Sequence, residues 1–505
     1  MKQKFSAIIL VISLTAITIN SFSQDSAAVT KPEKFITKHS IKIDNNLISY
    51  TATAGTLILK NEKDEPIASF GYTAYTKDGI TDLSKRPVTF SYNGGPGSSS
   101  MWLHMGVMGP RRVVVNDPSA NGPAPYTMED NNYSPLDVSD IIMIDPVGTG
   151  LSRAIGKAKN ADFWGVDPDI KSVSQFIKNY VNENERWNSP KFLLGESYGT
   201  FRSAGVADYL QDKMGISVNG VILVSTVLDI RTLSFNPGDE LSYVVNFPTY
   251  AATSWYHNKL TNKASNLDAF LKEVRVFAWG EYASALLKGD QLGAEEKEKV
   301  LIKLVGYTGI NKDYWEKANL RVKQPQYAQE LLRSSGLTVG RLDSRYKGIS
   351  QNMLSELAAK DPQSADISPA FISAFMNYFT TELKVSKDKN YNTSANSYPD
   401  FKWDWKHQRS NGLFGDASTP TTTPDLLNAM SNNPKMKILV MNGLYDLATP
   451  FGGAEYSFDH MGLNKDLKGN VIMKYYEAGH MMYIQKESAI KYKKDLVEFI
   501  IGALK

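Results

Sequence analysis

The chain has 505 residues, 42% of them hydrophobic, so it is long enough to bury a core larger than one ordinary domain needs. Its 56 Lys and Arg residues nearly balance 53 Asp and Glu residues, and the net charge of +3 comes without a long basic run. This balance argues against nucleic acid or an anionic membrane surface as a partner. The absence of cysteine excludes disulfides, thiolate metal sites and lipid attachment at cysteine.

The first 23 residues have the pattern of a secretory signal peptide. Lys2 and Lys4 precede an apolar run over residues 5–19, and the small residues Ser21 and Ser23 follow it. We predict cleavage after Ser23 and export to a bacterial periplasm or to the medium. A membrane anchor is the alternative, but the run is short for a span and lacks a basic stop on its far side. No later stretch is long and apolar enough to cross a bilayer, so we expect no membrane span in the mature chain.

Short strands dominate the mature chain up to Ser225 and return from Ile438. From His39 to Ala74, apolar and polar residues alternate between turn signals, which predicts antiparallel strands. Later apolar segments are typical of buried parallel strands, and a helix that begins near Pro168 separates the second from the third. These segments are Val88–Tyr92, Ile141–Asp145, Lys191–Leu194, Gly220–Ser225, Ile438–Met441 and Val471–Tyr475. Strands alternating with helices predict a central, mostly parallel sheet flanked by helices on both faces.

The alternation stops between residues 231 and 433. Apolar residues there follow a mainly helical spacing, as in the amphipathic stretches Leu267–Leu287 and Ser350–Leu357. The segment Tyr398–His407 alternates aromatic and charged residues and is the one strand signal in this region. We therefore predict a mainly helical cap inserted into the sheet domain. The predicted organisation is a signal peptide over 1–23, a core in two parts over 24–230 and 434–505, and the cap over 231–433.

A candidate nucleophile lies at the end of one predicted strand. Gly195-Glu196-Ser197-Tyr198-Gly199 follows the strand that ends at Leu194 and precedes a helix-like segment. A serine in Gly-x-Ser-x-Gly at such a turn is strained and exposed, as a nucleophile requires. An ordinary glycine turn is the alternative, and the flanking strand and helix disfavour it. Ser197 is therefore the candidate nucleophile.

A serine hydroxyl needs a base within hydrogen-bond reach, and the base needs a carboxylate to orient it. His480 follows the last predicted strand and precedes the final helix, while Asp446 follows the strand before it. The order Ser197, Asp446, His480 is that of the α/β-hydrolases, so the sequence predicts this fold. The candidates that suit this topology less well are His104 and His460 for the base and Asp459 for the acid.

Acyl transfer also needs N–H donors aimed at the developing oxyanion. The glycine-rich segment Asn93–Ser100 follows the strand Val88–Tyr92 and exposes backbone N–H groups. We assign the N–H groups of Gly95 and Tyr198 to the oxyanion hole. A phosphate-binding loop is the alternative, but the segment lacks the lysine of a P-loop.

Four motifs in this order resemble those of the serine carboxypeptidase family, peptidase family S10, and point to a bacterial-type member. They are Asn93-Gly94-Gly95-Pro96-Gly97, Asp145-Pro146-Val147-Gly148-Thr149-Gly150, Gly195-Glu196-Ser197-Tyr198-Gly199 and Gly479-His480-Met481. The resemblance implies a serine-type carboxypeptidase that removes C-terminal residues from peptides through an acyl-enzyme, without metal or organic cofactor. The expected partner is a peptide with a free C-terminal carboxylate.

The resemblance also implies which residues hold the substrate carboxylate. Asn93, Gly94 and Glu196 match three of the family's carboxylate-binding residues. Val107 stands where the family has a second glutamate, so the carboxyl pair that would share a proton is broken. The resemblance therefore gives no ground to assume an acidic pH optimum.

Two arginines close to Val107 offer a replacement for the missing glutamate. We hypothesise that Arg111 or Arg112 binds the carboxylate, since a guanidinium can clamp it with two hydrogen bonds. Two solvated arginines at the start of a strand are an equal alternative. Tyr198 and Tyr483, next to the candidate catalytic residues, are also expected to touch substrate.

Other functions stay open at this point. Trp403 and Trp405 line a side-chain pocket under the cap or belong to the core, and the core is the more frequent use of such aromatics. An esterase or acyltransferase on the same triad is the main alternative, because the carboxylate site is incomplete and the fold does not determine the acyl donor. A catalytically inactive binding module is a third possibility, against which the complete triad argues.

Overall fold

The computed structural model describes residues 31–407 and 420–505. The chain divides into two units, residues 1–31 and 32–505, and every element described here belongs to the second. The predicted signal peptide lies outside the described residues. Within the described part of the chain, no helix combines the length and the apolar character that a membrane crossing needs.

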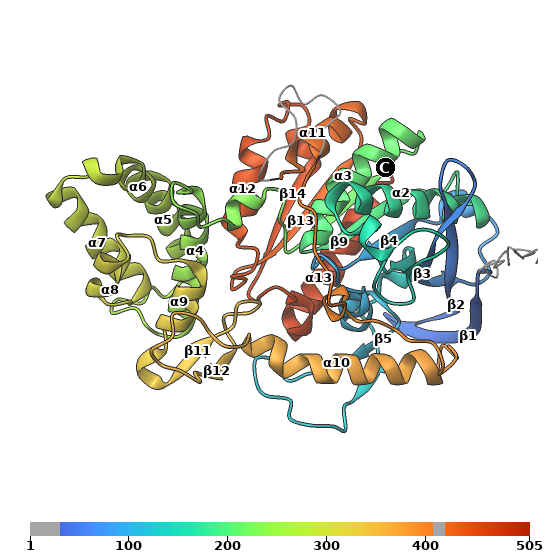
Figure 1. The fold of residues 1–505 in the computed structure, drawn as a ribbon, viewed down its shortest axis with the longest axis horizontal. Helices are drawn as coiled ribbons and strands as arrows, with labels where there is room; N and C mark the ends of the chain where they lie inside the picture. Colours follow the sequence, from blue (N-terminus) through green and yellow to red (C-terminus); the bar gives the residue numbers. More distant parts are fainter. Residues whose placement is uncertain (1–30, 408–419) are drawn as a thin grey trace, which may run out of the picture. The chain divides into compact units, whose positions relative to one another are not determined.

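A ten-stranded sheet forms the centre of the second unit (Figure 1). Its strand order is β1-β2-β3-β7-β4-β9-β10-β13-β14, with β8 paired to β3. The first four strands in this order pair antiparallel, and every pair from β7 to β14 is parallel. The strands are β1 Lys34–Ile43, β2 Asn46–Lys60, β3 Pro66–Lys77, β4 Val88–Tyr92, β7 Asp140–Ile144, β8 Arg153–Ala154, β9 Lys191–Glu196, β10 Gly220–Val224, β13 Lys437–Gly443 and β14 Val471–Tyr476.

Helices cover both faces of this sheet, because its central strands are apolar on both sides. Along β9, Phe192 and Leu194 belong to one apolar core and Leu193 to the other. The first core includes residues of α1 (Met101–Leu103), α10 (Pro362–Thr381) and α13 (Lys486–Gly502). The second includes residues of α2 (Val166–Glu183), α3 (Tyr198–Met214), α11 (Thr423–Asn432) and α12 (Phe451–His460). The predicted flanked, mostly parallel sheet is confirmed.

The segment between β10 and β13 is mainly helical and divides into two groups. Helices α4 to α9 share a third apolar core, which also includes Leu444, Tyr445, Leu447 and Phe451 from the segment after β13, and they form a separate group in Figure 1. By contrast, α10 and α11 pack on the two cores of the sheet. The first group comprises α4 Leu241–Tyr256, α5 Leu267–Phe277, α6 Ala283–Lys288, α7 Ala294–Thr308, α8 Lys312–Lys317 and α9 Gln324–Glu330, followed by the hairpin β11 Leu337–Val339 and β12 Lys347–Ile349.

Two local predictions in this segment were wrong. Residues 350–357 form turns instead of a helix, because the Asn352 side chain accepts the N–H of Leu354, and Leu354 is 91% exposed. Residues 398–407 contain only one isolated bridge, between Gly165 and Asp404, in place of a strand. The predicted helix Leu267–Leu287 is present as α5 and α6, joined by a π-helical turn over Ala278–Tyr282.

Candidate active site

The segments that follow four of the parallel strands, β4, β9, β13 and β14, meet at one cavity of about 240 Å³. This edge of an open parallel sheet is where such folds bind their ligands. The cavity brings together most of the residues that the sequence predicted, which come from the loops after β4, β9 and β14. Those lining it are Asn93, Gly94, Gly95, Glu196, Ser197 and His480.

Ser197 occupies a sharp turn between β9 and α3. Its backbone has φ 61° and ψ −130°, a left-handed conformation that side chains rarely adopt. The flanking glycines permit this turn, since a Cβ at Gly195 would lie 2.0 Å from the carbonyl oxygen of Gly199. The Ser197 N–H donates to Val224 O at 2.9 Å and so ties the turn to β10. The strained, accessible serine predicted from the motif is therefore present.

The loop after β4 lies directly against this turn. A Cβ at Gly94 would come within 2.5 Å of the backbone nitrogens of Tyr198 and Gly199. The buried Arg202 guanidinium holds the loop from below by donating to Asn93 O at 2.7 Å. On its far side, the Asp145 carboxylate accepts the N–H of Ser100 at 2.8 Å. The second motif thus supports the loop that carries the predicted oxyanion donor.

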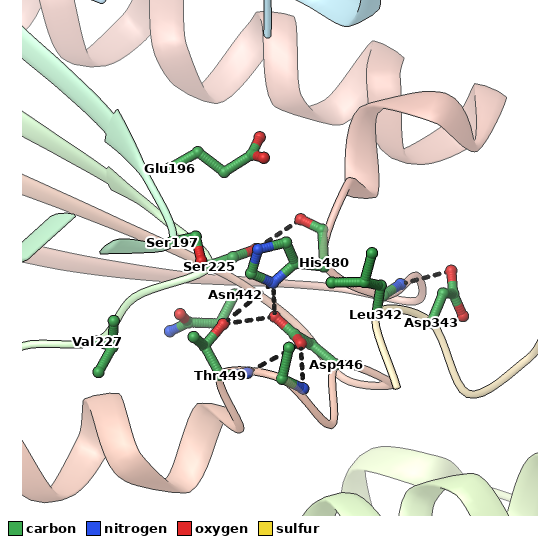
Figure 2. A network of polar contacts seen from close by, with 12 residues as sticks. Glu196, Ser197, Ser225, Val227, Leu342, Asp343, Asn442, Asp446, Thr449 and His480 are labelled. Carbon is green, nitrogen blue, oxygen red and sulfur yellow. Dashed lines mark hydrogen bonds and ion pairs between the residues drawn. The ribbon is translucent and has the colours of Figure 1, made fainter. Parts of the chain in front are cut away.

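Asp446 and His480 meet beside the serine turn (Figure 2). His480 Nδ1 lies 2.7 Å from Asp446 Oδ2. The Asp446 carboxylate also accepts the N–H groups of Ala448 and Thr449, at 2.8 and 3.0 Å, and the Thr449 hydroxyl at 2.7 Å. This Asx-type turn holds the carboxylate in one orientation. Thr449 was not predicted from the sequence, although a polar residue three positions after an aspartate is a signal for such a turn.

The charge of Asp446 governs the titration of His480. Burial lowers the pKa of the imidazole, but the charge and the hydrogen bond of Asp446 outweigh it, and the net shift is upward. Ser197 lies next to the imidazole in the same cavity (Figure 2). Both residues are described, and no hydrogen bond joins them. Such contacts often close only when substrate binds, so the arrangement is compatible with general-base catalysis.

Glu196 is a buried carboxyl at the inner wall of the cavity. Asn93 Nδ2 donates to its Oε1 at 2.9 Å, and the Tyr483 hydroxyl donates to its Oε2 at 2.6 Å. Burial is the largest effect on this group and raises its pKa to about 7. Val107 is fully buried among apolar side chains, and the predicted lack of a second carboxyl is a feature of the structure.

A loop of the inserted segment, residues 341–344, holds both the acid and the base in place. The His480 N–H donates to Leu342 O at 2.7 Å, and the Gly479 N–H donates to the Asp343 carboxylate at 2.9 Å. Ser344 donates its N–H to Tyr445 O at 2.9 Å, next to Asp446. The sequence carries no signal for this loop, because its contacts join segments more than 100 residues apart.

Several predicted substrate contacts do not reach the cavity. Arg111 forms ion pairs with Asp130 and Glu382, and Arg112 pairs with Glu129 at 3.1 Å. Both lie on the short strand β5 (Arg111–Val113), which pairs with β6 (Met128–Asp130). Neither lines the cavity, so the structure does not support their proposed role as a carboxylate clamp.

The aromatic residues close to the candidate catalytic residues do not line the cavity either. The buried Tyr198 ring packs against Trp403 and Trp405, with ring centroids 5.2 and 5.9 Å apart. Tyr483 is buried and meets the cavity only through Glu196. Tyr198, Tyr483 and Trp403 therefore act as packing around the site, whereas the Trp405 ring is exposed.

The alternative candidates for the base and the acid lie outside the cavity. His104 is buried with its Nε2 against the Tyr75 hydroxyl, whereas His460 and Asp459 are exposed at the end of α12. Across residues 31–407 and 420–505, no group of three or more His, Cys, Asp or Glu side chains is arranged to hold a metal ion. The cavity that holds Ser197 is thus the candidate active site.

Comparisons with known proteins agree with this geometry. Residues 59–230 match the family model of the serine carboxypeptidases. No curated protein matches the sequence. Among solved structures, Kex1(delta)p, a prohormone-processing carboxypeptidase from Saccharomyces cerevisiae, is 17% identical with a TM-score of 0.54, over 90% of this chain and 91% of the yeast chain. A proline iminopeptidase from Mycobacterium smegmatis is 12% identical, with a TM-score of 0.36, over 92% of this chain and 98% of that one.

The likeness to the yeast structure shows the fold, and the matched segment carries three of the four motifs. The strand order, the turn at Ser197 and the placement of Asp446 and His480 after successive strands belong to the α/β-hydrolase fold. The prediction of this fold is confirmed. The chain is therefore similar to the serine carboxypeptidases over residues 59–230 and has the α/β-hydrolase fold.

Proposed function

We propose that the protein is an exported serine carboxypeptidase, which releases C-terminal residues from peptides through an acyl-enzyme on Ser197. The observation that carries this proposal is one cavity lined by Ser197, His480 and Glu196, with Asp446 bonded to the histidine at 2.7 Å. His480 would take the proton of the serine hydroxyl and then give it to the leaving amine. Asp446 would hold the tautomer of His480 that this transfer requires.

The oxyanion would be stabilised at the junction of two loops. The N–H groups of Gly95 and Tyr198 are our candidates, because the two loops approach so closely that a Cβ added at Gly94 would lie 2.5 Å from the Tyr198 nitrogen. Two such donors lower the barrier of acylation and deacylation alike. Asn93 and Glu196 would then contact the substrate carboxylate.

The test compares a blocked dipeptide that has a free C-terminal carboxylate with its C-terminal amide. We expect cleavage of the free acid, slower or no cleavage of the amide, and no activity in Ser197→Ala. Covalent labelling of Ser197 by a fluorophosphonate, absent in Ser197→Ala, would report the nucleophile independently. Cleavage of the acid that persists in Ser197→Ala would refute the mechanism.

An esterase or acyltransferase is the second candidate, and one observation favours it. Val107 is buried where a second carboxyl would complete the carboxylate site of the family. If neither peptide is cleaved while a simple ester is hydrolysed through Ser197, this second function replaces the first.

Export is part of the proposal and rests on the sequence of the first 23 residues. We expect the mature protein to begin at Gln24 and to be recovered from the periplasm or the medium. Mass determination of the N-terminal peptide tests this expectation. A mature chain that still carries Met1 or the apolar run would contradict it.

A further inference from the structure

An arginine from the inserted segment faces the cavity beside the candidate base. Arg341 lines the cavity together with Ser197 and His480, and it is the only lysine or arginine among the described residues that do so. Its side chain is exposed and forms no ion pair or hydrogen bond with another residue of the described ranges. A guanidinium left without a protein partner at a substrate cavity is available to an anion.

The backbone of Arg341 is held firmly against the acid and base loops. Its carbonyl accepts the N–H of Leu447 at 3.1 Å, next to Asp446. Leu342, the next residue, donates its N–H to the Asp361 carboxylate at 3.0 Å and accepts the N–H of His480 at 2.7 Å. The Cα of Arg341 is therefore held in a defined position relative to His480. Only the flexible part of the Arg341 side chain has to become ordered when an anion binds.

The position beside His480 identifies the part of the substrate that Arg341 meets. In acyl transfer by a serine triad, the histidine protonates the nitrogen of the leaving residue. In a carboxypeptidase substrate, the α-carboxylate is two bonds from this nitrogen, so it lies on the histidine side of the cavity. Ser364, in the first turn of α10, lines the same cavity and adds a neutral hydroxyl, whereas the Ser368 hydroxyl already donates to Ser364 O at 2.6 Å.

The charges of the cavity also favour an anion there. Glu196 is the only acidic residue among the described ones that line it, and burial raises its pKa to about 7. Below that pH the carboxyl is mainly neutral, and Arg341 gives the cavity a net positive charge. The positive charge of Arg341 also acts on His480, because it lowers the pKa of the imidazole. The charge of Asp446 raises the same pKa by more.

We propose that Arg341 binds the C-terminal carboxylate of the substrate with two parallel hydrogen bonds on the leaving-group side, and so replaces the carboxyl that is missing at Val107. The identity of this carboxylate rests on the proposed function. The inserted segment thereby supplies a specificity-determining residue that neither the motifs nor the arginines on β5 supply.

The test measures binding without cleavage. In the Ser197→Ala background, calorimetry at pH 6 would compare N-acetyl-phenylalanyl-leucine, as the free acid, with its C-terminal amide. We expect the acid to bind at least about tenfold tighter than the amide. Arg341→Gln should lower the affinity for the acid by about 10- to 100-fold and change the affinity for the amide less than twofold. Arg341→Lys keeps the charge but not the planar fork, so an intermediate loss is expected.

Lys347→Gln is the matched control, because it removes an exposed positive charge from β12, six residues away, without touching the cavity. It should leave both affinities unchanged. N-acetyl-phenylalanyl-aspartyl amide, whose only carboxylate is on the last side chain, distinguishes the two sources of a carboxylate. If Arg341→Gln weakens only this ligand, Arg341 recognises an acidic side chain and the proposal is overturned.

The proposal also fails if the acid has no advantage over the amide in the Ser197→Ala protein, or if its advantage survives in both Arg341 variants. Thermal melting of each variant shows whether it is folded. Because binding is measured in a variant that cannot cleave, the outcome is separate from the proposed function. An acid preference that depends on Arg341, in a protein whose active form cleaves no peptide, would refute the peptidase and leave the carboxylate site in place.

Discussion

The two sides of the candidate active site are held by different forces. On the serine side, Gly94 and Gly195 allow backbones to approach so closely that a Cβ would lie 2.5 Å or less from neighbouring backbone atoms. On the acid and base side, Asp446 accepts hydrogen bonds from Thr449, and His480 donates its N–H to Leu342 O in the loop over residues 341–344. A larger side chain should therefore disrupt the serine side, whereas removal of a hydrogen-bonding group should disrupt the acid and base side.

The largest expected effect is on the acid and base side. Asp446→Asn keeps the shape of the side chain but removes the charge that stabilises the imidazolium of His480, and we expect kcat to fall by about 10⁴-fold. Steady-state hydrolysis of an activated ester measures this loss. Asp459→Asn, an exposed carboxylate on α12, should leave the rate unchanged. An Asp446→Asn enzyme within tenfold of the parent would exclude Asp446 as the orienting acid.

The serine side should be the next most sensitive. A Cβ at Gly94 meets only backbone atoms that cannot move aside, so Gly94→Ala should shift the loop that carries the Gly95 N–H and lower kcat by about 10²- to 10³-fold. Gly306→Ala is the control, because it lies within α7 and its Cβ would have no neighbour within 4 Å. If both variants keep full activity, close packing does not maintain this side.

A single hydrogen bond on the acid and base side should have a smaller effect. Thr449→Val removes the hydroxyl that donates to Asp446 Oδ2 and keeps both backbone donors. The loss of about 1 kcal/mol predicts a decrease in kcat of roughly fivefold. Thr381→Val, at the exposed end of α10, is the control. A loss as large as that of Asp446→Asn would mean that the hydroxyl, and not the carboxylate charge, orients His480.

The last effect is confined to the alkaline side of the pH profile. Because burial raises the pKa of Glu196 to about 7, its carboxyl ionises above neutrality and repels the substrate carboxylate. We expect kcat/KM for a free peptide acid to fall by roughly tenfold per pH unit above about 7. Glu196→Gln cannot ionise and should lose this alkaline decrease. The corresponding amide substrate should show no such decrease in either protein.

The acidic side of the same profile reports the base. His480 must be neutral to accept a proton, and its pKa is raised, so activity should decrease as the pH drops below a value above 6.5. Together with Glu196 this predicts an optimum close to neutrality for the peptide acid. The two groups share one cavity, so the measured values belong to the pair. An optimum in the acidic range would contradict both shifts.

Local sequence patterns were sufficient to predict the strands of the sheet, but they predicted the elements of the inserted segment less well. Strands such as Val88–Tyr92 were predicted at their observed bounds, because strands buried on both faces are continuous apolar runs between turns. Residues 350–357 had the spacing of a helix but lie exposed in turns, since spacing does not tell whether an apolar face has anything to pack against. The hairpin of β11 and β12, three residues a strand, was too short to give a pattern.

The sequence by itself determined the positions of Ser197, Asp446 and His480, since each follows a strand signal and the chain order matches one fold. Only the tertiary structure decided which charged groups reach the cavity. Arg111 and Arg112, near the missing glutamate in sequence, are occupied by ion pairs, whereas Arg341 lines the cavity from a loop bonded to His480. The physical reason is that catalytic motifs depend on local backbone geometry, while the charge of a pocket depends on contacts between segments far apart in the chain.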